Sequence, residues 1–300
     1  MFKRLLPVLL AGALAVSACG GDDDDGNASG SSDTTDAPAE TEEPAGDAPE
    51  KIVSLSPTAT EMLFAVGAGD QVVAVDDQSD FPEGVPTTDL SGYEPNVEAI
   101  AGYEPDLVVM DSDAIQGELE ALGIELYVAP AATTLDDTYS QIEALGELTG
   151  HADEATQLVT DMKAEIETIT SSLEAPAEPL TFYHELDDQY YSITSDTFIG
   201  QVYKLVGLDN IADGAGDGSE YPQLSAEYII EQDPDFIFLA DTECCSQDAS
   251  TVAARPGWEN LSAVTNDGVV EMSDDVSSRW GPRVVEYLQA VADAVEAQAA

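Results

Sequence analysis

The stretch Glu98-Ala-Ile-Ala-Gly-Tyr-Glu-Pro105-Asp106-Leu-Val-Val-Met110 has a second copy, Glu227-Tyr-Ile-Ile-Glu-Gln-Asp-Pro234-Asp235-Phe-Ile-Phe-Leu239. In each copy, a Glu opens a short amphipathic helix, and Pro-Asp then precedes an apolar run typical of a strand. A spacing of about 130 residues is too long for a solenoid, whose repeats run about 20–50 residues. We therefore expect two related lobes, and a cleft between domains is a preferred place for a ligand.

A second repeated motif precedes each copy in the same order. It reads Leu63-Phe-Ala-Val-Gly67-Ala-Gly-Asp70 in the first half and Tyr203-Lys-Leu-Val-Gly207-Leu-Asp209 in the second. Strand and helix patterns alternate in both halves, which favours a parallel sheet covered by helices. The predicted fold class is α/β, with two Rossmann-like lobes joined by one long α-helix and a ligand cleft between the lobes. Strands are expected at 51–55, 72–75, 107–110, 125–128, 180–183, 191–193, 236–239 and 269–272, and helices at 60–66, 115–122, 198–206 and 282–297.

Between the halves the pattern is helical without strand signals. Apolar residues repeat at helical spacing from Ala155 to Ile169, and Pro176 and Pro179 end the run. This gives an N-terminal α/β lobe at 50–150, a linking helix at 151–175 and a C-terminal α/β lobe at 176–300. One long connecting helix, rather than several strands, predicts a stiff pair of lobes.

The first 18 residues have the form of an export signal. Lys3 and Arg4 precede an apolar stretch, Leu5 to Val16, that is too short to span a bilayer. Val16-Ser17-Ala18-Cys19 resembles the bacterial lipobox, with Cys19 as the lipidated residue; the alternative is an ordinary cleaved signal with a chance Cys. Residues 19–49 are small, polar and acidic, which predicts a disordered tether. The expected location is therefore extracytoplasmic, lipid-anchored to the bacterial cell membrane through Cys19.

Charge excludes one class of partner. Asp and Glu number 61 against 8 Lys and Arg, for a formal net charge of −53. A surface this negative repels nucleic acid, so no nucleic-acid partner is expected. The few cations after the signal become individually informative.

Beyond Cys19, the chain has two more cysteines, Cys244 and Cys245. Neighbouring Cα atoms lie about 3.8 Å apart, below the usual disulfide range of about 4.4–6.8 Å. The sequence leaves open a strained bridge between them or two packed thiols. It contains no disulfide framework.

Seven motifs in order carry a family resemblance over about residues 50–297. They are Ile52-Val-Ser-Leu-Ser-Pro57-Thr-Ala-Thr-Glu61, Ser79-Asp-Phe-Pro82, Asn96-Val-Glu98, Pro105-Asp-Leu-Val108, Thr194-Ser195, Tyr221-Pro-Gln223 and Arg279-Trp-Gly-Pro-Arg283. This string resembles the helical-backbone (cluster III) substrate-binding proteins of ABC importers for cobalamin, ferric siderophores and haem, and is closest in pattern to the cobalamin-binding members. The resemblance implies a receptor without catalysis, resident cofactor or metal site. Its implied partners are an ABC permease dimer with its ATPase and a small-molecule metal chelate.

The resemblance also implies a docking role for Glu98 and Glu227. The matching glutamates of the family project from the two lobes and pair with arginines of the permease. The alternative is a helix N-terminal acid favoured by the helix dipole, an effect of about 0.3–1 kcal/mol.

Ligand candidates follow from the rule that ligands of parallel sheets sit beyond the carboxyl ends of the strands. Arg279 would attract an anionic ligand group, the alternative being a surface ion pair, whereas Arg283 is expected to cap or pair within the last helix. Cobalamin binders of the family have aromatics where this chain has Gln78 and Asp111. The predicted ligand residues are Ser56, Pro57, Gln78, Gly92, Tyr93, Asp111, Tyr191, Tyr221, Arg279 and Trp280.

The favoured ligand is a cobalamin-like corrinoid, with a ferric siderophore or haem as the alternative within the family. A different class would be a surface redox protein or enzyme using Cys244, Cys245 and His184. His184-Glu185 after a strand could form an acid–base pair, but a position on the cleft rim is the preferred interpretation. With two histidines in the chain, a tri-His metal site lacks its ligands.

Overall fold

The structure is a computed structural model that describes residues 48–173, 179–216 and 218–299. The predicted export signal, Cys19 and nearly all of the predicted tether lie outside these residues. All of the described residues belong to one compact unit. Among the described residues, no helix has the length and apolarity needed to cross a membrane.

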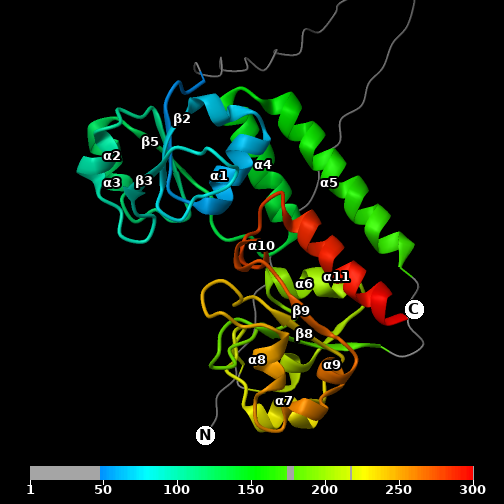
Figure 1. The fold of residues 1–300 in the computed structure, drawn as a ribbon. Coiled ribbons are helices and arrows are strands. Elements are labelled where there is room, and N and C mark those ends of the chain that lie inside the picture. Colours follow the sequence, from blue (N-terminus) through cyan, green and yellow to red (C-terminus); the bar gives the residue numbers. More distant parts are fainter. Residues whose placement is uncertain (1–47, 174–178, 217, 300) are drawn as a thin grey trace, which may run out of the picture. The chain divides into compact units, whose positions relative to one another are not determined.

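The N-terminal lobe is built on a five-stranded sheet in which every pairing is parallel. In the strand order β3-β2-β1-β4-β5, the chain first adds strands on one side of β1 and then on the other side, as in doubly wound folds. Three short helices, α1, α2 and α3, alternate with the strands (Figure 1). The bounds are β1 Ile52–Ser54, α1 Pro57–Ala65, β2 Val72–Asp76, β3 Thr87–Leu90, α2 Val97–Ala101, β4 Leu107–Met110, α3 Gln116–Leu122 and β5 Glu125–Val128, with a 3-10 turn at Ala68–Gln71.

The C-terminal lobe repeats this plan with four parallel strands in the order β7-β6-β8-β9. The strand predicted at 191–193 is wrong, because Tyr191 forms only an isolated antiparallel bridge with Gln223. The bounds are β6 Thr181–Glu185, α6 Phe198–Leu205, β7 Asp209–Asn210, α7 Ala226–Gln232, β8 Phe236–Leu239, α8 Ala249–Ala253, α9 Ser262–Thr265, β9 Val269–Glu271 and α10 Asp274–Ser278, with 3-10 turns at Ile211–Gly214 and Trp258–Asn260.

Three longer helices complete the fold, α4 (Leu135–Thr149), α5 (Ala152–Ser172) and α11 (Val284–Ala299). The predicted linking helix is confirmed as α5, which runs without interruption from the N-terminal to the C-terminal lobe (Figure 1). Two α/β lobes with parallel sheets joined by one long helix are therefore what the sequence predicted.

The duplicated Pro-Asp has the same structural task in both lobes. The Asp106 carboxylate accepts hydrogen bonds from the backbone N–H groups of Glu50 and Lys51, at 2.9 and 3.0 Å, at the start of β1. The Asp235 carboxylate accepts from the backbone N–H and hydroxyl of Thr181, at 2.8 and 3.1 Å, at the start of β6. In each lobe this Asp ties the strand it precedes to the first strand of the sheet.

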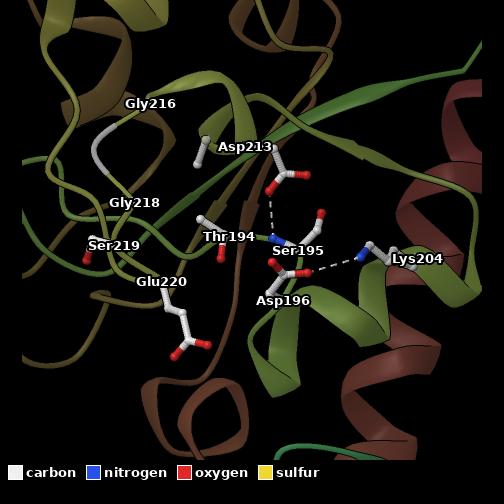
Figure 2. Close-up of a pocket in the computed structure, with 10 residues that line it drawn as sticks. Thr194, Ser195, Asp196, Lys204, Asp213, Gly216, Gly218, Ser219 and Glu220 are labelled. Carbon is white, nitrogen blue, oxygen red and sulfur yellow. Dashed lines mark hydrogen bonds and ion pairs between the residues drawn. The ribbon is translucent and has the colours of Figure 1, made fainter. Parts of the chain in front are cut away.

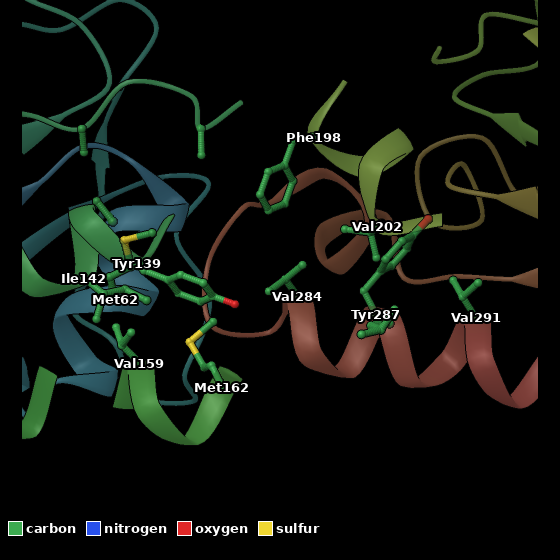
Figure 3. Close-up of a cluster of buried hydrophobic side chains, with 14 of the residues drawn as sticks. Met62, Tyr139, Ile142, Val159, Met162, Phe198, Val202, Val284, Tyr287 and Val291 are labelled. Atoms are coloured by element: carbon green, nitrogen blue, oxygen red, sulfur yellow. The ribbon is translucent and has the colours of Figure 1, made fainter. Parts of the chain in front are cut away.

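The sheet residues divide between three hydrophobic clusters according to the alternation of a strand. In β4, Val108 faces a cluster confined to the N-terminal lobe, while Val109 belongs to the largest cluster. In β8, Ile237 faces a cluster confined to the C-terminal lobe, while Phe238 belongs to that same largest cluster. The largest cluster also takes in buried residues of the long helices, among them Tyr139, Met162 and Tyr287 (Figure 3). One apolar core therefore continues through the long helices from one sheet to the other.

Candidate functional site

The carboxyl ends of the N-terminal strands surround a pocket of about 540 Å³, called here the N-lobe pocket. Its lining comes from the residues that follow β1, β2, β3 and β4. Five predicted ligand residues meet there: Pro57, Gln78, Gly92, Tyr93 and Asp111. Gly92 leaves no room for a side chain, because a Cβ would lie 2.3 Å from the Leu55 carbonyl oxygen. The remaining lining residues are Leu55, Asp76, Asp77, Ser91 and Ser112.

The carboxyl ends of the C-terminal strands surround a second pocket of about 590 Å³, called here the C-lobe pocket. Tyr221 and Trp280, both predicted ligand residues, line it together with apolar side chains such as Ile193 and Phe198. Residues 131–133, which follow β5 of the N-terminal lobe, also belong to its lining. The Trp280 indole is fixed by donation to the side-chain oxygen of Gln141 at 3.2 Å.

Three predicted ligand residues are outside both pockets. Ser56 is buried as the N-cap of α1, where its hydroxyl accepts from the Ala59 N–H. Tyr191 is 38% exposed at its isolated bridge. Arg279 is buried in a network of carboxylates.

The Arg279 guanidinium joins residues that are far apart in sequence. It donates to Glu61 of α1 at 2.8 Å, to Asp275 at 2.6 Å and to Asp80 at 3.2 Å. It also donates to the backbone carbonyl of Gln78, a residue of the N-lobe pocket, at 3.2 Å. Arg279 is therefore neutralised by acids within the chain.

Arg283 shares the same buried acid. Its Nε and Nη2 donate to the two carboxylate oxygens of Glu61 at 2.9 and 2.5 Å. The expectation that Arg283 pairs within the last helix is wrong, because Glu61 in α1 supplies the carboxylate. Both Glu61 and Arg279 are nearly excluded from solvent, and a buried charge must be paired.

A second buried cluster, which the sequence reasoning missed, lies at the end of β6. Arg255 makes a two-point contact with Glu185 at 2.6 and 2.5 Å and donates to Gln247 at 2.8 Å. Asp241 lies beside this pair, and neither of its side-chain oxygens has a hydrogen-bond partner among the described residues. Burial, together with the Glu185 charge, raises the pKa of Asp241 to about 7. The scarcity of cations was the sequence signal that could have revealed this cluster, because an arginine in so acidic a chain is expected to pair with a carboxylate.

The electrostatic consequence is that both pockets are lined by acids. Asp196, Glu220 and Asp274 line the C-lobe pocket, and Asp76, Asp77 and Asp111 line the N-lobe pocket. Within the part of the chain that the structure describes, neither lining contains a Lys or Arg. Burial raises the pKa of Asp76, whose Oδ1 has no described hydrogen-bond partner. A negative surround of this kind favours neutral or cationic ligand groups over anionic ones.

A third hollow of about 550 Å³ adjoins the C-lobe pocket and shares Asp196 and Glu220 with it. Figure 2 shows its polar walls, where the Asp213 carboxylate accepts from the Ser195 N–H at 2.8 Å. Its cation, Lys204, lies 3.9 Å from the Asp196 carboxylate. None of the predicted ligand residues lines this hollow.

His184 is fully buried, so its predicted position on the cleft rim is wrong. Its Nδ1 lies 2.9 Å from the Tyr203 hydroxyl, which in turn contacts the Tyr287 hydroxyl. Burial lowers the pKa of His184 to about 3 and raises those of both tyrosines, so all three groups are neutral at ordinary pH. The residue nevertheless belongs to the lining of the C-lobe pocket.

Cys244 and Cys245 form a disulfide, which decides between the two possibilities that the sequence left open. Cys244 is exposed and lines the C-lobe pocket. The Asp274 carboxylate holds the loop by accepting from the N–H groups of Glu243 and Cys244, at 3.1 and 2.8 Å.

The two predicted docking acids occupy matching positions. Glu98 is the second residue of α2, after the N-cap Asn96, and Glu227 is the second residue of α7, after the N-cap Ser225. Both are exposed. In each helix the residue two positions later, Ile100 or Ile229, is fully buried and fixes the orientation of the helix.

Comparison with known proteins identifies relatives over most of the chain. A family model described as periplasmic binding protein matches residues 52–276. The uncharacterized ABC transporter substrate-binding lipoprotein YvrC of Bacillus subtilis is 29% identical over 258 residues, covering 82% of this chain and 80% of the relative. A cobalamin-binding protein of Halobacterium salinarum is 31% identical over 260 residues, covering 82% of this chain and 69% of the relative.

Solved structures with the same fold include the periplasmic vitamin B12 binding protein BtuF of Vibrio cholerae. It has a TM-score of 0.68 and 25% identity, covering 84% of this chain and 98% of that chain. The periplasmic heme-binding protein RhuT from Roseiflexus sp. RS-1, in apo form, has a TM-score of 0.72 and 22% identity, covering 83% of this chain and 99% of that chain. The second likeness shows the fold alone.

Proposed function

The chain belongs to the periplasmic binding protein family, and we propose that it is the receptor of an ABC importer that captures a cobalamin-like corrinoid. In this proposal the receptor works outside the cytoplasm and passes the ligand to a permease dimer driven by its ATPase. Lipid on Cys19 would tether it to the membrane. The relatives in Bacillus subtilis, Halobacterium salinarum and Vibrio cholerae, with the names given above, support this assignment.

The observation that carries the choice of ligand is the pairing of every arginine in the described residues. Arg255, Arg279 and Arg283 all bind carboxylates of this chain, and no Lys or Arg lines either of the two main pockets as described. An anionic chelate entering these acidic pockets would meet no free guanidinium. A corrinoid, whose periphery carries neutral carboxamides, avoids this repulsion. Haem and anionic ferric siderophores are therefore less well supported as ligands.

The ligand contacts that we propose are the predicted residues that line the two pockets. These are Pro57, Gln78, Gly92, Tyr93 and Asp111 on one side and Tyr221 and Trp280 on the other. Tyr93 is 94% exposed and Tyr221 is 54% exposed, so both rings have apolar area available for a bound macrocycle. Of the alternative class, a surface redox protein or enzyme using Cys244, Cys245 and His184, only an enzyme with a free thiol loses support, because Cys244 and Cys245 are joined to each other.

A fluorescence titration of the purified protein with cyanocobalamin, haemin and a small siderophore panel tests the proposal. We expect binding of cyanocobalamin with quenching of Trp280, which lines the C-lobe pocket, while Trp258 is fully buried elsewhere. The Trp280→Phe variant retains Trp258 and should lose most of the quenching. If a siderophore binds and cyanocobalamin does not, the ligand assignment is overturned. A catalytic activity of the purified protein that Cys244→Ser abolishes would overturn the receptor assignment.

A further inference from the structure

One ring nitrogen of His184, Nε2, lacks a described hydrogen-bond partner. This residue is the fourth of β6, has no exposed surface and belongs to the lining of the C-lobe pocket. Its Nδ1 contacts Tyr203, but its buried Nε2 has no hydrogen-bond partner among the described residues. An unsatisfied buried polar atom is destabilising, so Nε2 calls for a partner that the described residues do not supply.

The two tautomers of the His184 ring differ in which buried donor they leave without an acceptor. If Nδ1–H donated to Tyr203, then Tyr203 would donate to Tyr287. The Tyr287 hydroxyl hydrogen would then have no acceptor, since its other described neighbour is the same Nδ1 at 3.5 Å. Tyr287 is fully buried and does not line the C-lobe pocket, so no ligand there could satisfy it.

The opposite direction satisfies both hydroxyl donors. Tyr287 donates to Tyr203, Tyr203 donates to Nδ1, and the imidazole proton is left on Nε2. Either direction leaves one donor unsatisfied, but here it is Nε2–H, which belongs to a residue of the pocket lining, where a ligand can accept from it. This tautomer has no lone pair on Nε2, so it can donate a hydrogen bond but cannot ligate a metal.

The surroundings restrict the acceptor. Asp196, Glu220 and Asp274 line the same pocket and disfavour an anionic group, while Leu186, Ile193 and Phe198 supply apolar walls. A neutral oxygen can enter such a site with less desolvation than a carboxylate. The acceptor must come within about 2.7–3.2 Å of Nε2, which requires the side chains over the buried ring to part around it.

We propose that His184 is a specificity-determining residue of the C-lobe pocket, where its Nε2–H, oriented by Tyr203 and Tyr287, donates to a neutral carbonyl oxygen of the captured ligand. The peripheral carboxamides of a corrinoid provide such oxygens, so the inference rests on the proposed function. The Nε2–H group can donate to either a neutral amide oxygen or a carboxylate, and the acids that line the same pocket disfavour the carboxylate.

Imidazole nitrogen NMR of the ¹⁵N-labelled protein tests the tautomer directly. The chain has two histidines, so His151→Gln assigns both sets of signals. We expect His184 to be Nε2-protonated in the free wild-type protein, and saturating cyanocobalamin to shift its Nε2 signal. Nδ1 protonation in the free protein would overturn the inference. An Nε2 signal that is unchanged while cyanocobalamin binds would also overturn it.

Variants test the contribution to affinity. His184→Phe removes the donor and should weaken cyanocobalamin binding roughly 3- to 10-fold, whereas His184→Gln keeps an N–H donor and should recover part of the loss. Tyr203→Phe removes the partner that orients the ring, and should shift the tautomer signals as well as the affinity. Tyr183→Phe is the matched control, since its hydroxyl is buried in the same strand without lining the pocket.

Failure of the proposed function is distinguishable from failure of this inference. If cyanocobalamin does not bind at all, the ligand assignment fails. The His184 tautomer in the free protein still tests the hydrogen-bond chain from Tyr287 through Tyr203 to Nδ1. If cyanocobalamin binds equally well to wild type and to folded His184→Phe, the function stands and the donor is overturned.

Discussion

Single residues set the electrostatics of this protein, and Glu61 is the buried acid that two arginines share. Its carboxylate is nearly excluded from solvent and serves both Arg279 and Arg283. Neutralising it would leave two cations partly buried with fewer counter-charges. Removing one member of a buried ion pair typically costs about 3–5 kcal/mol.

We therefore expect Glu61→Gln to lower the free energy of unfolding by roughly 3–5 kcal/mol. Urea denaturation followed by circular dichroism measures the change. Glu104→Gln is the control, because Glu104 forms an exposed pair with Lys51 at 3.1 Å and should change stability by at most about 1 kcal/mol. Equal stability of wild type and Glu61→Gln would show that the network is not needed for folding.

Asp241 predicts a pH dependence with a definite sign. Its pKa is raised from 3.8 to about 7, mainly by burial and then by the Glu185 charge, so the folded state holds this proton more tightly than the unfolded state. Its contribution to stability is therefore full below about pH 4 and is lost as pH rises towards 7. His184 has the opposite effect, since its pKa is lowered to about 3 and stability falls as pH drops below 6.5.

Asp241→Asn should remove the first of these two effects. Between pH 4 and pH 7, we expect the free energy of unfolding of the variant to rise by about 1–3 kcal/mol relative to that of wild type, after allowance for screening by solvent. Unfolding measured in urea at several pH values gives the difference between the two curves. A difference that does not change with pH in this interval would contradict the assignment of the raised pKa to Asp241.

At the scale of elements, the duplication explains why α2 and α7 present equivalent surfaces. Each begins at a polar N-cap, exposes a Glu at its second residue and buries an Ile two residues later. The Pro-Asp turn after each helix is tied to the first strand of its own sheet. The two glutamates are therefore held on matching short helices, as docking on a twofold permease would require.

Charge reversal tests the proposed docking. The double variant Glu98→Arg with Glu227→Arg should strongly reduce uptake in cells while leaving ligand affinity nearly unchanged, because neither residue lines a pocket. Uptake of labelled cobalamin and titration of the purified protein measure the two effects. The control is Glu118→Arg with Glu259→Arg, which reverses two other exposed acids. Equal losses of uptake in both double variants would contradict a specific docking role.

At the scale of the whole molecule, the net charge of −53 governs how ligands approach. Long-range repulsion slows association of an anion and is screened by salt over about 8–10 Å at physiological ionic strength, whereas a neutral ligand is insensitive to this field. We expect the association rate of cyanocobalamin to change little with NaCl. Any binding of an anionic siderophore should become faster as salt is added, as stopped-flow fluorescence would show. A rate for the anion that falls with salt would indicate an unpaired cationic site.

Local patterns in the sequence were sufficient for the architecture. Helical spacing along residues 152–172 and the duplicated Glu, Gly and Pro-Asp offsets predicted two parallel-sheet lobes and the helix between them, because these signals come from burial and capping within one segment. Ligand residues were predicted from the rule that ligands meet the carboxyl ends of parallel strands, and seven of the ten line one of the two pockets. Whether those residues bind the ligand stays a prediction.

Only the tertiary structure decided how the few cations are used. Arg279 and Arg283 lie more than 200 positions from Glu61 along the chain, and Arg255 lies 70 positions from Glu185. No local pattern encodes such pairs, because they exist only once the lobes and long helices have packed. The same holds for His184, whose neighbours Tyr203 and Tyr287 come from α6 and α11. Sequence fixes which segments fold as helices and strands, whereas long-range packing determines which charges remain free to meet a ligand.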